Sequence, residues 1–177
     1  MIRIGQGFDV HAFAEEALAP GNTIQLGGVP VPHERRVVAH SDGDLLLHAL
    51  TDAILGALAL GDIGHYFPDT DPAFKGVDSA QLLARVWQDV QRQGYRLGNA
   101  DITLIGERPK LSLYVPAIRE RIAALLGVDT SAISVKATTT EKLGFTGRSA
   151  GLFASAIWAS MVLCAWWVRN SPPSISA

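Results

Sequence analysis

The clearest pattern of apolar and polar positions lies between residues 39 and 71. Its apolar side chains recur every three or four residues, which is the spacing of one face of an α-helix. They are Leu46, Leu47, Leu50, Ile54, Leu55 and Leu58. Ser41 is followed three residues later by Asp44, which predicts that Ser41 caps this helix and that Asp44 bonds back to the N–H group of the cap.

One edge of the same helix is polar. Asp44, His48 and Asp52 stand four residues apart, so their side chains form one stripe along the helix. Two carboxylates beside an imidazole are typical of a metal-binding histidine whose neighbours orient it. An ordinary histidine on a polar helix edge is the alternative, and the helix alone does not decide between the two.

The rest of the chain alternates predicted strands and helices. Apolar and β-branched residues predict strands at 2–11, 95–105 and 133–137, a hairpin at 24–31, and helices at 79–93 and 115–126. Glycine, proline and charged residues predict loops at 15–22, 33–36, 61–76 and 106–110. This order favours a layered α/β or α+β domain over residues 1–169, followed by a disordered tail at 170–177.

The first strand carries two more candidate ligands. Asp9 and His11 are two residues apart, so in an extended chain both side chains lie on the same face. With His48 they offer two imidazoles and one carboxylate, which leaves a coordination position open for water or substrate. A polar strand end is the alternative, because the sequence does not itself bring this strand and the helix together.

Composition narrows the class of protein. The chain has 177 residues, a net charge of −2 and one cysteine, Cys164. A chain of this length can bury a real core, and it has no basic field that would favour nucleic acid. One cysteine excludes an internal disulfide framework and a Cys-rich zinc site. The N-terminus lacks the features of a signal peptide, so we expect a cytoplasmic protein.

A long uncharged segment lies near the C-terminus. Residues 150–168 hold no charged side chain and lie between Arg148 and Arg169, which is roughly the length of a membrane span. No comparable segment accompanies it, and a buried strand or an oligomer interface would have the same composition. We therefore expect no membrane partner.

Two further segments carry candidate chemistry. In 136–148, three threonines after a predicted strand offer hydroxyl and N–H groups to an anion, and Glu141 could hold a divalent cation. A capped helix N-terminus would look the same. In the loop after the central helix, Asp62, Asp69 and Asp71 either cap short helices or belong to a loop that closes over a site.

Five stretches together resemble the 2-C-methyl-D-erythritol 2,4-cyclodiphosphate synthase family. They are GFDVHAF (7–13), AHSDGDLLLHALTDAILGALALGDIG (39–64), FPDTDPAFKG (67–76), GYRLGNADITLI (94–105) and KATTTEKLGFTGR (136–148). The resemblance extends over about residues 2–162, in order and with few gaps. It implies a single α+β domain with helices on one side of a mixed sheet. It also implies a homotrimer with the sheets lining the centre and active sites between subunits.

The resemblance implies a reaction as well. The family's substrate is 4-diphosphocytidyl-2-C-methyl-D-erythritol 2-phosphate, whose 2-phosphate attacks the β-phosphate to give a cyclic diphosphate and release CMP. By this likeness Asp9, His11 and His48 would hold Zn²⁺, and Glu141 would hold a second divalent ion, Mg²⁺ or Mn²⁺. Metal charge would offset the repulsion between the two phosphates.

Further site residues follow from the same resemblance. His40 and Ser41 match a pair that contacts the substrate phosphates, Thr139 matches a hydroxyl that stabilises the transition state, and His40 and Thr139 are therefore predicted to be catalytic. The other predicted substrate-binding positions are Val10, Asp62, Ile63, Gly64, Phe67, Pro68, Asp69, Thr70, Asp71, Gly106, Glu107, Arg108, Pro109, Lys110, Leu111, Ser112, Thr138 and Thr140. Of these, 62–71 would surround the methylerythritol, and 106–112 with Thr138 would form the cytosine pocket. Phe145 and Arg148 match a cavity on the trimer axis that can hold isoprenoid diphosphates.

Two departures from the family pattern affect the predicted ligand sites. Glu107 and Arg108 stand where small, neutral residues are expected, which alters the size and charge of the predicted cytosine pocket. Ser149 and Ala150 follow Arg148 where many relatives have Gly and Glu. Three copies of Arg148 would then lack an acidic partner and favour an anion on the trimer axis.

Two other functions stay open at this level. A metal-dependent phosphohydrolase would use the same ligands with water as the nucleophile. A trimeric module could instead bind isoprenoid diphosphate without catalysis. The candidate metal ligands, together with Thr139 and Glu141, disfavour the module, because binding on the axis would not need them.

Overall fold

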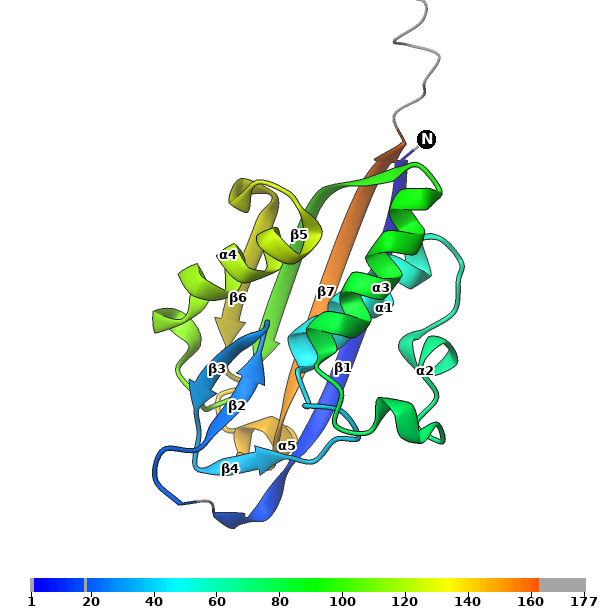
Figure 1. The fold of residues 1–177 in the computed structure, drawn as a ribbon. Helices are drawn as coiled ribbons and strands as arrows, with labels where there is room; N and C mark the ends of the chain where they lie inside the picture. The colour runs from blue at the N-terminus through cyan, green and yellow to red at the C-terminus, as the bar shows by residue number, and fades with distance from the viewer. Residues whose placement is uncertain (1, 18, 163–177) are drawn as a thin grey trace, which may run out of the picture.

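The structure of this protein is a computed structural model that describes residues 2–17 and 19–162. Figure 1 shows a long twisted sheet with the main helices on one of its faces. The strands are β1 (Ile2–Ala17), β2 (Thr23–Leu26), β3 (Val29–Pro32), β4 (Arg35–Val37), β5 (Tyr95–Ile105), β6 (Ile133–Thr138) and β7 (Gly151–Val162). The helices are α1 (Leu45–Ala57), α2 (Ile63–Tyr66), α3 (Ser79–Arg92), α4 (Val115–Leu126) and α5 (Gly144–Gly147), with 3₁₀ turns at Pro72–Phe74, Leu111–Leu113 and Thr130–Ala132.

The main sheet is mixed and runs in the order β4-β1-β7-β5-β6. Its neighbours are antiparallel except β5 and β6, which run parallel because α4 crosses between them. β2 and β3 form a separate hairpin whose turn residues, Gly27 and Gly28, both have positive φ. These elements confirm the predicted α+β class with a mixed sheet.

α1 is the central helix, and it is enclosed on both sides. It packs on β1 and β7 through one face and against α3 through the other. All of its residues except Asp52 and Gly56 are buried. Gly5 and Gly7 of β1 allow this close packing, because a Cβ at Gly5 would lie 2.6 Å from the backbone N of Ala57.

The opposite face of the sheet is apolar but exposed. Along β1 the side chains alternate, and the ones that point away from the helices are Ile2, Ile4, Phe8 and Val10. Ile4 is 70% exposed and Phe8 is 62% exposed, and Ile157 of β7 lies on the same face with 48% exposed. One chain therefore leaves a broad apolar sheet surface uncovered.

Four local predictions were wrong, and one of them is the loop at 61–76, which contains the short helix α2. β1 continues to Ala17, so the loop predicted from residue 15 begins later. The segment predicted as a charged loop at 33–36 overlaps β4, in which Val37 pairs with Phe13 of β1. Charged residues are compatible with a strand there because β4 lies at the edge of the sheet. Ser41 is not the helix cap, since α1 begins after Asp44, whose carboxylate accepts from the N–H of Leu47.

The uncharged segment near the C-terminus forms a strand in its described part. β7 lies between β1 and β5, and its side chains that face the helices, such as Leu152 and Trp158, are buried. The end of that segment and the predicted tail at 170–177 lie outside the described residues. Among the residues that are described, no helix has both the length and the apolarity to cross a membrane.

Candidate metal centre and surrounding site

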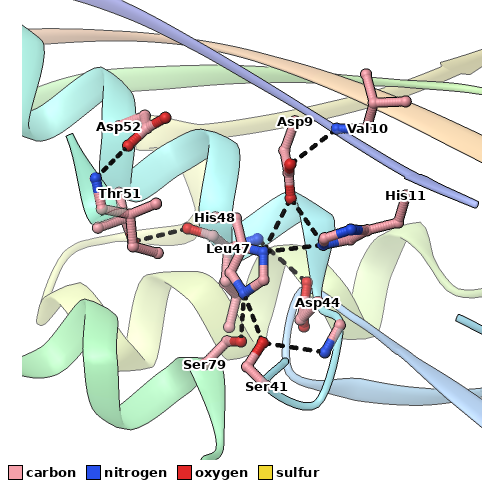
Figure 2. A network of polar contacts seen from close by, with 12 residues as sticks. Asp9, Val10, His11, Ser41, Asp44, Leu47, His48, Thr51, Asp52 and Ser79 are labelled. Carbon is pink, nitrogen blue, oxygen red and sulfur yellow. Dashed lines mark hydrogen bonds and ion pairs between the residues drawn. The ribbon is translucent and has the colours of Figure 1, made fainter. Parts of the chain in front are cut away.

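Three donor atoms from distant parts of the chain meet between β1 and α1 (Figure 2). Asp9 Oδ2 lies 2.8 Å from His48 Nδ1 and 3.0 Å from His11 Nε2. The two imidazole nitrogens are 3.2 Å apart. Among residues 2–17 and 19–162, Asp9, His11 and His48 form the only group of three or more His, Cys, Asp or Glu side chains that are close enough to hold a metal ion. A candidate metal-binding site is therefore present.

Strand alternation and helix packing together produce this convergence. Asp9 and His11 are partly buried and share the face of β1 that meets α1, as their spacing predicts. His48 lies in the first turn and a half of α1 and points back to that face. Because Gly7 has no side chain, the backbone of α1 lies directly against β1 at this level.

The electrostatics of this group favour a negative charge on Asp9 and a positive charge on His48. Burial raises the pKa of Asp9, but hydrogen bonds and charge from His11 and His48 together hold that pKa well below its usual range. Burial lowers the pKa of His48, but the hydrogen bond and charge of Asp9 raise it above its usual value. A proton and a cation therefore compete for the same imidazole nitrogen.

The second nitrogen of His48 faces hydroxyl groups. His48 Nε2 lies 2.8 Å from Ser79 Oγ and 3.1 Å from Ser41 Oγ. Ser79, the first residue of α3, is only 1% exposed. Sequence reasoning missed Ser79, because a serine at the start of a predicted helix has the ordinary composition of a helix N-terminus.

The predicted flanking carboxylates do not orient His48 through hydrogen bonds. Asp44 turns to the β2–β3 hairpin, where its two carboxylate oxygens accept from the N–H groups of Gly27 at 2.8 Å and Gly28 at 2.6 Å. Asp52 accepts from the N–H of Ile63 at 2.7 Å. Burial raises the pKa of each carboxyl, and these backbone N–H groups act in the opposite direction. Both residues hold neighbouring segments in place.

A small cavity of about 140 Å³ opens beside the metal group. Its wall includes two of the candidate ligands, His11 and His48, and the pair predicted to contact phosphate, His40 and Ser41. From the predicted methylerythritol loop, the cavity is lined by Ile63, Phe67 and Asp69. Candidate ligands and candidate phosphate-binding residues therefore share one concave surface.

Other residues predicted to bind the substrate do not line this cavity. Asp62 caps α2 by accepting from the N–H of His65 at 2.8 Å, and Asp71 accepts from the N–H of Ala73 at 2.9 Å. Val10 projects its side chain to the far face of the sheet, while its N–H donates to Asp9 Oδ1 at 2.8 Å. Gly64, Pro68 and Thr70 are not among the residues that line the cavity.

The predicted second metal site lies on a separate turn after β6. Thr139 Oγ1 donates to Glu141 Oε1 at 2.8 Å. Glu141 and Lys142 have φ of 53° and 64°, a left-handed conformation that is uncommon for residues other than glycine. Glu141 does not belong to the group formed by Asp9, His11 and His48. Thr140 Oγ1 lies 3.0 Å from Thr146 Oγ1, a contact that links the turn to α5.

The predicted cytosine segment faces a larger cavity. Glu107, Arg108, Pro109 and Lys110 line a space of about 620 Å³ together with residues 19–22 and 32–34. Gly106, Leu111, Ser112 and Thr138 are not among the residues that line it. Glu107 Oε1 also accepts from the N–H of Lys142 at 3.1 Å, so it links this segment to the turn that carries Glu141.

The two residues predicted to face a trimer axis are exposed in one chain. Phe145 lies in α5 and is 42% exposed, and Arg148 follows that short helix. No carboxylate of the described residues forms an ion pair with Arg148.

The chain is similar to known proteins in family, in sequence and in fold. The model of the YgbB family matches residues 2–161. A relative from Alcanivorax borkumensis named 2-C-methyl-D-erythritol 2,4-cyclodiphosphate synthase is 59% identical over 156 residues, which are 88% of this chain and 94% of the relative. A relative of the same name from Listeria monocytogenes is 55% identical over 157 residues, which are 89% and 97% of the two chains.

A solved structure described as the CDP complex of IspF from Plasmodium falciparum superposes on this one. Its TM-score is 0.78 at 37% identity, and the match covers 91% of this chain and 96% of the other. Fold, matched length and sequence identity lead to one conclusion: the chain belongs to the YgbB family, among relatives named 2-C-methyl-D-erythritol 2,4-cyclodiphosphate synthase.

Proposed function

We propose that this protein is a phosphorus–oxygen lyase that converts 4-diphosphocytidyl-2-C-methyl-D-erythritol 2-phosphate to 2-C-methyl-D-erythritol 2,4-cyclodiphosphate and CMP. An oxygen of the 2-phosphate bonds to the β-phosphorus. The bond from that phosphorus to the oxygen shared with the α-phosphate breaks, and its electron pair leaves with CMP. The observation that carries this proposal is the Asp9, His11 and His48 group in the same wall as His40 and Ser41.

The spacing of the three donors suits a zinc ion. Two ligand atoms of a tetrahedral Zn²⁺, each about 2.0–2.1 Å from the metal, lie about 3.3 Å apart. The three separations here are 2.8, 3.0 and 3.2 Å. Two imidazoles and one carboxylate leave a fourth position open, as in catalytic zinc sites. Zn²⁺ held there would supply positive charge against the two phosphates that must approach each other.

The chain's own residues would orient and stabilise the reacting groups. Ser41 lines the small cavity with a hydroxyl, and His40 adds an imidazole in the same wall, so both suit phosphate oxygens. Thr139 donates its hydroxyl proton to Glu141, and this carboxylate would hold a second divalent ion, Mg²⁺ or Mn²⁺, which would supply further positive charge against the phosphates. The cytidine would lie against residues 106–112 and Thr138.

We propose that the complete site forms between copies of the chain in a homotrimer. In one chain, the cavity beside the metal group is lined by neither Thr139 nor Glu141. The sheet face carrying Ile4, Phe8 and Val10 is apolar and exposed, and three such faces can bury one another. A single Phe8→Glu substitution would then convert the trimer to monomers in sedimentation experiments, whereas a native molecule that sediments as a monomer would contradict the assembly.

A trimer would also bring three copies of Phe145 and Arg148 together. Because Arg148 has no carboxylate partner among the described residues, a diphosphate with an apolar tail suits this position. We keep this as an additional binding site rather than an alternative function, because a binding module would not need the metal group. The phosphorylated, water-soluble substrate fits action in the cytoplasm.

Product analysis tests the reaction directly. The protein is incubated with the cytidyl substrate, Zn²⁺ and Mg²⁺, and the phosphorus species are followed by ³¹P NMR. We expect the cyclic diphosphate and CMP in equal amounts. Linear hydrolysis products would identify a phosphohydrolase, and unchanged substrate with a folded, metal-loaded protein would contradict catalysis.

A matched pair of variants links activity to the metal group. Asp9→Asn removes a proposed ligand, so turnover is expected to fall by at least about 100-fold. Asp129→Asn removes an exposed carboxylate that accepts from the N–H of Ser131, and it is expected to retain activity. Removal of metal with a chelator should mimic the first variant, and added Zn²⁺ should restore turnover.

A further inference from the structure

On the side of the His48 imidazole that faces away from the other candidate ligands, a chain of hydrogen bonds runs from Nε2 to a carboxylate. His48 Nδ1 faces Asp9 and His11, whereas Nε2 points away from them toward the start of α3. There Ser79 Oγ lies 2.8 Å from Nε2, in a part of the protein that solvent does not reach. Ser79 in turn donates its hydroxyl proton to Asp42 Oδ1.

This arrangement leaves one consistent assignment of protons. A serine hydroxyl can donate only one hydrogen bond, and here it donates that bond to Asp42 Oδ1. Ser79 Oγ can therefore only accept from His48, so Nε2 must carry the proton in that bond. In the neutral imidazole the lone pair then lies on Nδ1, which is the nitrogen that faces Asp9 and His11.

Asp42 is itself fixed by several backbone contacts. Its Oδ2 accepts from the N–H of Ser79 at 3.2 Å, and its Oδ1 accepts from the N–H of Asp44 at 3.2 Å. The N–H of Asp42 donates to the carbonyl oxygen of Val77 at 3.1 Å. The carboxylate therefore connects the starts of α1 and α3, and the position of the Ser79 hydroxyl depends on both.

Ser41 has a different role although it is also near Nε2. Its Oγ lies farther away, at 3.1 Å, and accepts from the N–H of Gly43 at 3.2 Å. Ser41 also lines the cavity where phosphate would bind. Its hydroxyl proton thus remains available to a ligand, whereas the Ser79 proton is already committed to Asp42.

We propose that Ser79 and Asp42 are positioning residues that hold His48 in the Nε2-protonated form and thereby tighten the binding of the divalent ion at Nδ1. This inference rests on the metal centre proposed above. Groups that orient metal-bound histidines in this way typically change metal affinity by about 10- to 100-fold when they are removed. Neither residue is expected to touch the ion or the substrate.

The experiment measures Zn²⁺ affinity of the full chain by competition with a chromophoric chelator. Ser79→Ala removes the acceptor, and we expect Zn²⁺ to bind about 10- to 100-fold more weakly. Ser79→Cys keeps the size of the side chain but is a poor acceptor, so it serves if the alanine variant does not fold. Asp42→Asn keeps an oxygen that can accept the Ser79 proton, and we expect a smaller loss than for Ser79→Ala.

Thr51→Ala is the matched control. Thr51 is also a buried hydroxyl residue, on the same helix as His48, but it donates to the carbonyl oxygen of Leu47 at 2.7 Å and does not contact the imidazole. Loss of the Thr51 hydroxyl should lower the stability of the fold about as much as Ser79→Ala does. It should leave the Zn²⁺ affinity within about threefold of that of the original protein. The absorption spectrum of the Co²⁺-substituted protein, which reports ligand geometry, should change in Ser79→Ala and stay unchanged in Thr51→Ala.

The possible outcomes separate the two proposals. If the unaltered chain binds no Zn²⁺, or binds it as well after His48→Ala, the metal centre itself is wrong and the positioning role is wrong with it. If the unaltered chain binds one Zn²⁺ through His48, but the Ser79 variants bind it equally well or Thr51→Ala weakens it as much, only the positioning role is overturned.

Discussion

Gly7 of β1 lies so close to the backbone of Ala49 of α1 that a Cβ at Gly7 would overlap the Ala49 carbonyl oxygen. The same Cβ would lie 2.6 Å from the backbone N of Ala53. Ala49 follows His48, and Gly7 precedes Asp9 by two residues. The contact between strand and helix therefore sets the distance between the candidate metal ligands that the two elements carry.

Gly7→Ala is expected to separate β1 from α1 locally. The added methyl group must displace backbone rather than a flexible side chain, so unfolding free energy should fall by about 1–3 kcal/mol or more. Zn²⁺ affinity should fall together with stability, because His48 moves relative to Asp9 and His11. Denaturant titration and metal competition on the same samples measure both effects.

Gly56→Ala provides the comparison on the same helix. A Cβ at Gly56 would have its nearest neighbour at 3.6 Å, the carbonyl oxygen of Gln6, which is an ordinary contact. Since alanine favours a helix over glycine by about 1 kcal/mol, this variant should be as stable as the original or more stable. A Gly7→Ala protein with unchanged stability and metal affinity would contradict the role assigned to the close packing.

Asp44→Ala should cost far more than the loss of an ordinary helix cap. Its buried carboxylate accepts from the N–H groups of Gly27, Gly28 and Leu47, so it joins the β2–β3 hairpin to the start of α1. Two buried donors and one half-buried donor would lose their partner, and we expect a loss of about 3 kcal/mol or more in unfolding free energy.

Asp78→Ala is the control for that prediction. Asp78 caps α3 by accepting from the N–H of Ala80 at 2.8 Å in an exposed position. Its removal should cost about 1 kcal/mol, the usual value for an N-cap. Equal losses for the two variants, measured by denaturant titration, would show that the hairpin contacts of Asp44 contribute nothing.

Glu107→Ala is expected to loosen the turn that carries Glu141. Two consecutive residues there have positive φ, which costs about 1–2 kcal/mol per residue, and Glu107 accepts from the N–H of Lys142. Without this acceptor, trypsin should cleave after Lys142 several-fold faster than in the original protein. Glu107→Gln keeps an acceptor oxygen and should be cleaved at the original rate, whereas cleavage of the alanine variant at that same rate would refute the link.

The ion pair between the exposed side chains of Asp101 and Lys136 should contribute little to the stability of the folded protein. Lys136 Nζ donates to Asp101 Oδ2 at 2.6 Å, and this bond lowers the pKa of Asp101. Because both side chains are more than a third exposed, solvent screens them, and Lys136→Met should cost less than about 1 kcal/mol at pH 7.

The difference in unfolding free energy between the original protein and Lys136→Met depends on pH with a definite sign. A carboxyl whose pKa is lower in the folded protein contributes stability above its unfolded pKa of about 3.9, and loses that contribution as the pH falls through the folded value. The two proteins should therefore differ most near neutral pH and converge in acid. A difference that grows in acid would rule out Asp101 as its source.

Local patterns predicted much of what the structure contains. The two-residue spacing of Asp9 and His11 predicted a shared strand face, and the spacing of the leucines around His48 predicted α1. Both predictions succeed because they depend only on the geometry of a strand and of a helix. The motifs that resemble the synthase family lie in these same elements, and the family assignment was confirmed.

Tertiary packing decided the partners of these side chains. Asp44 and Asp52 share a helix edge with His48, yet they bond to Gly27, Gly28 and Ile63. Ser79, far from His48 in sequence, bonds to His48 instead. Helical spacing states which residues share an edge, but not which distant segment covers that edge.

The sequence by itself therefore determined β1 and α1, the faces of these elements on which Asp9, His11 and His48 lie, and the family, whereas β4 and α2 were not predicted. Only the tertiary structure decided that the three donors meet within 3.2 Å, that Ser79 stands behind the imidazole, and that Glu141 lies apart from them in one chain. The reason is physical: periodicity is local to a few residues, whereas these distances depend on how closely two elements pack, here through the bare backbone of Gly7.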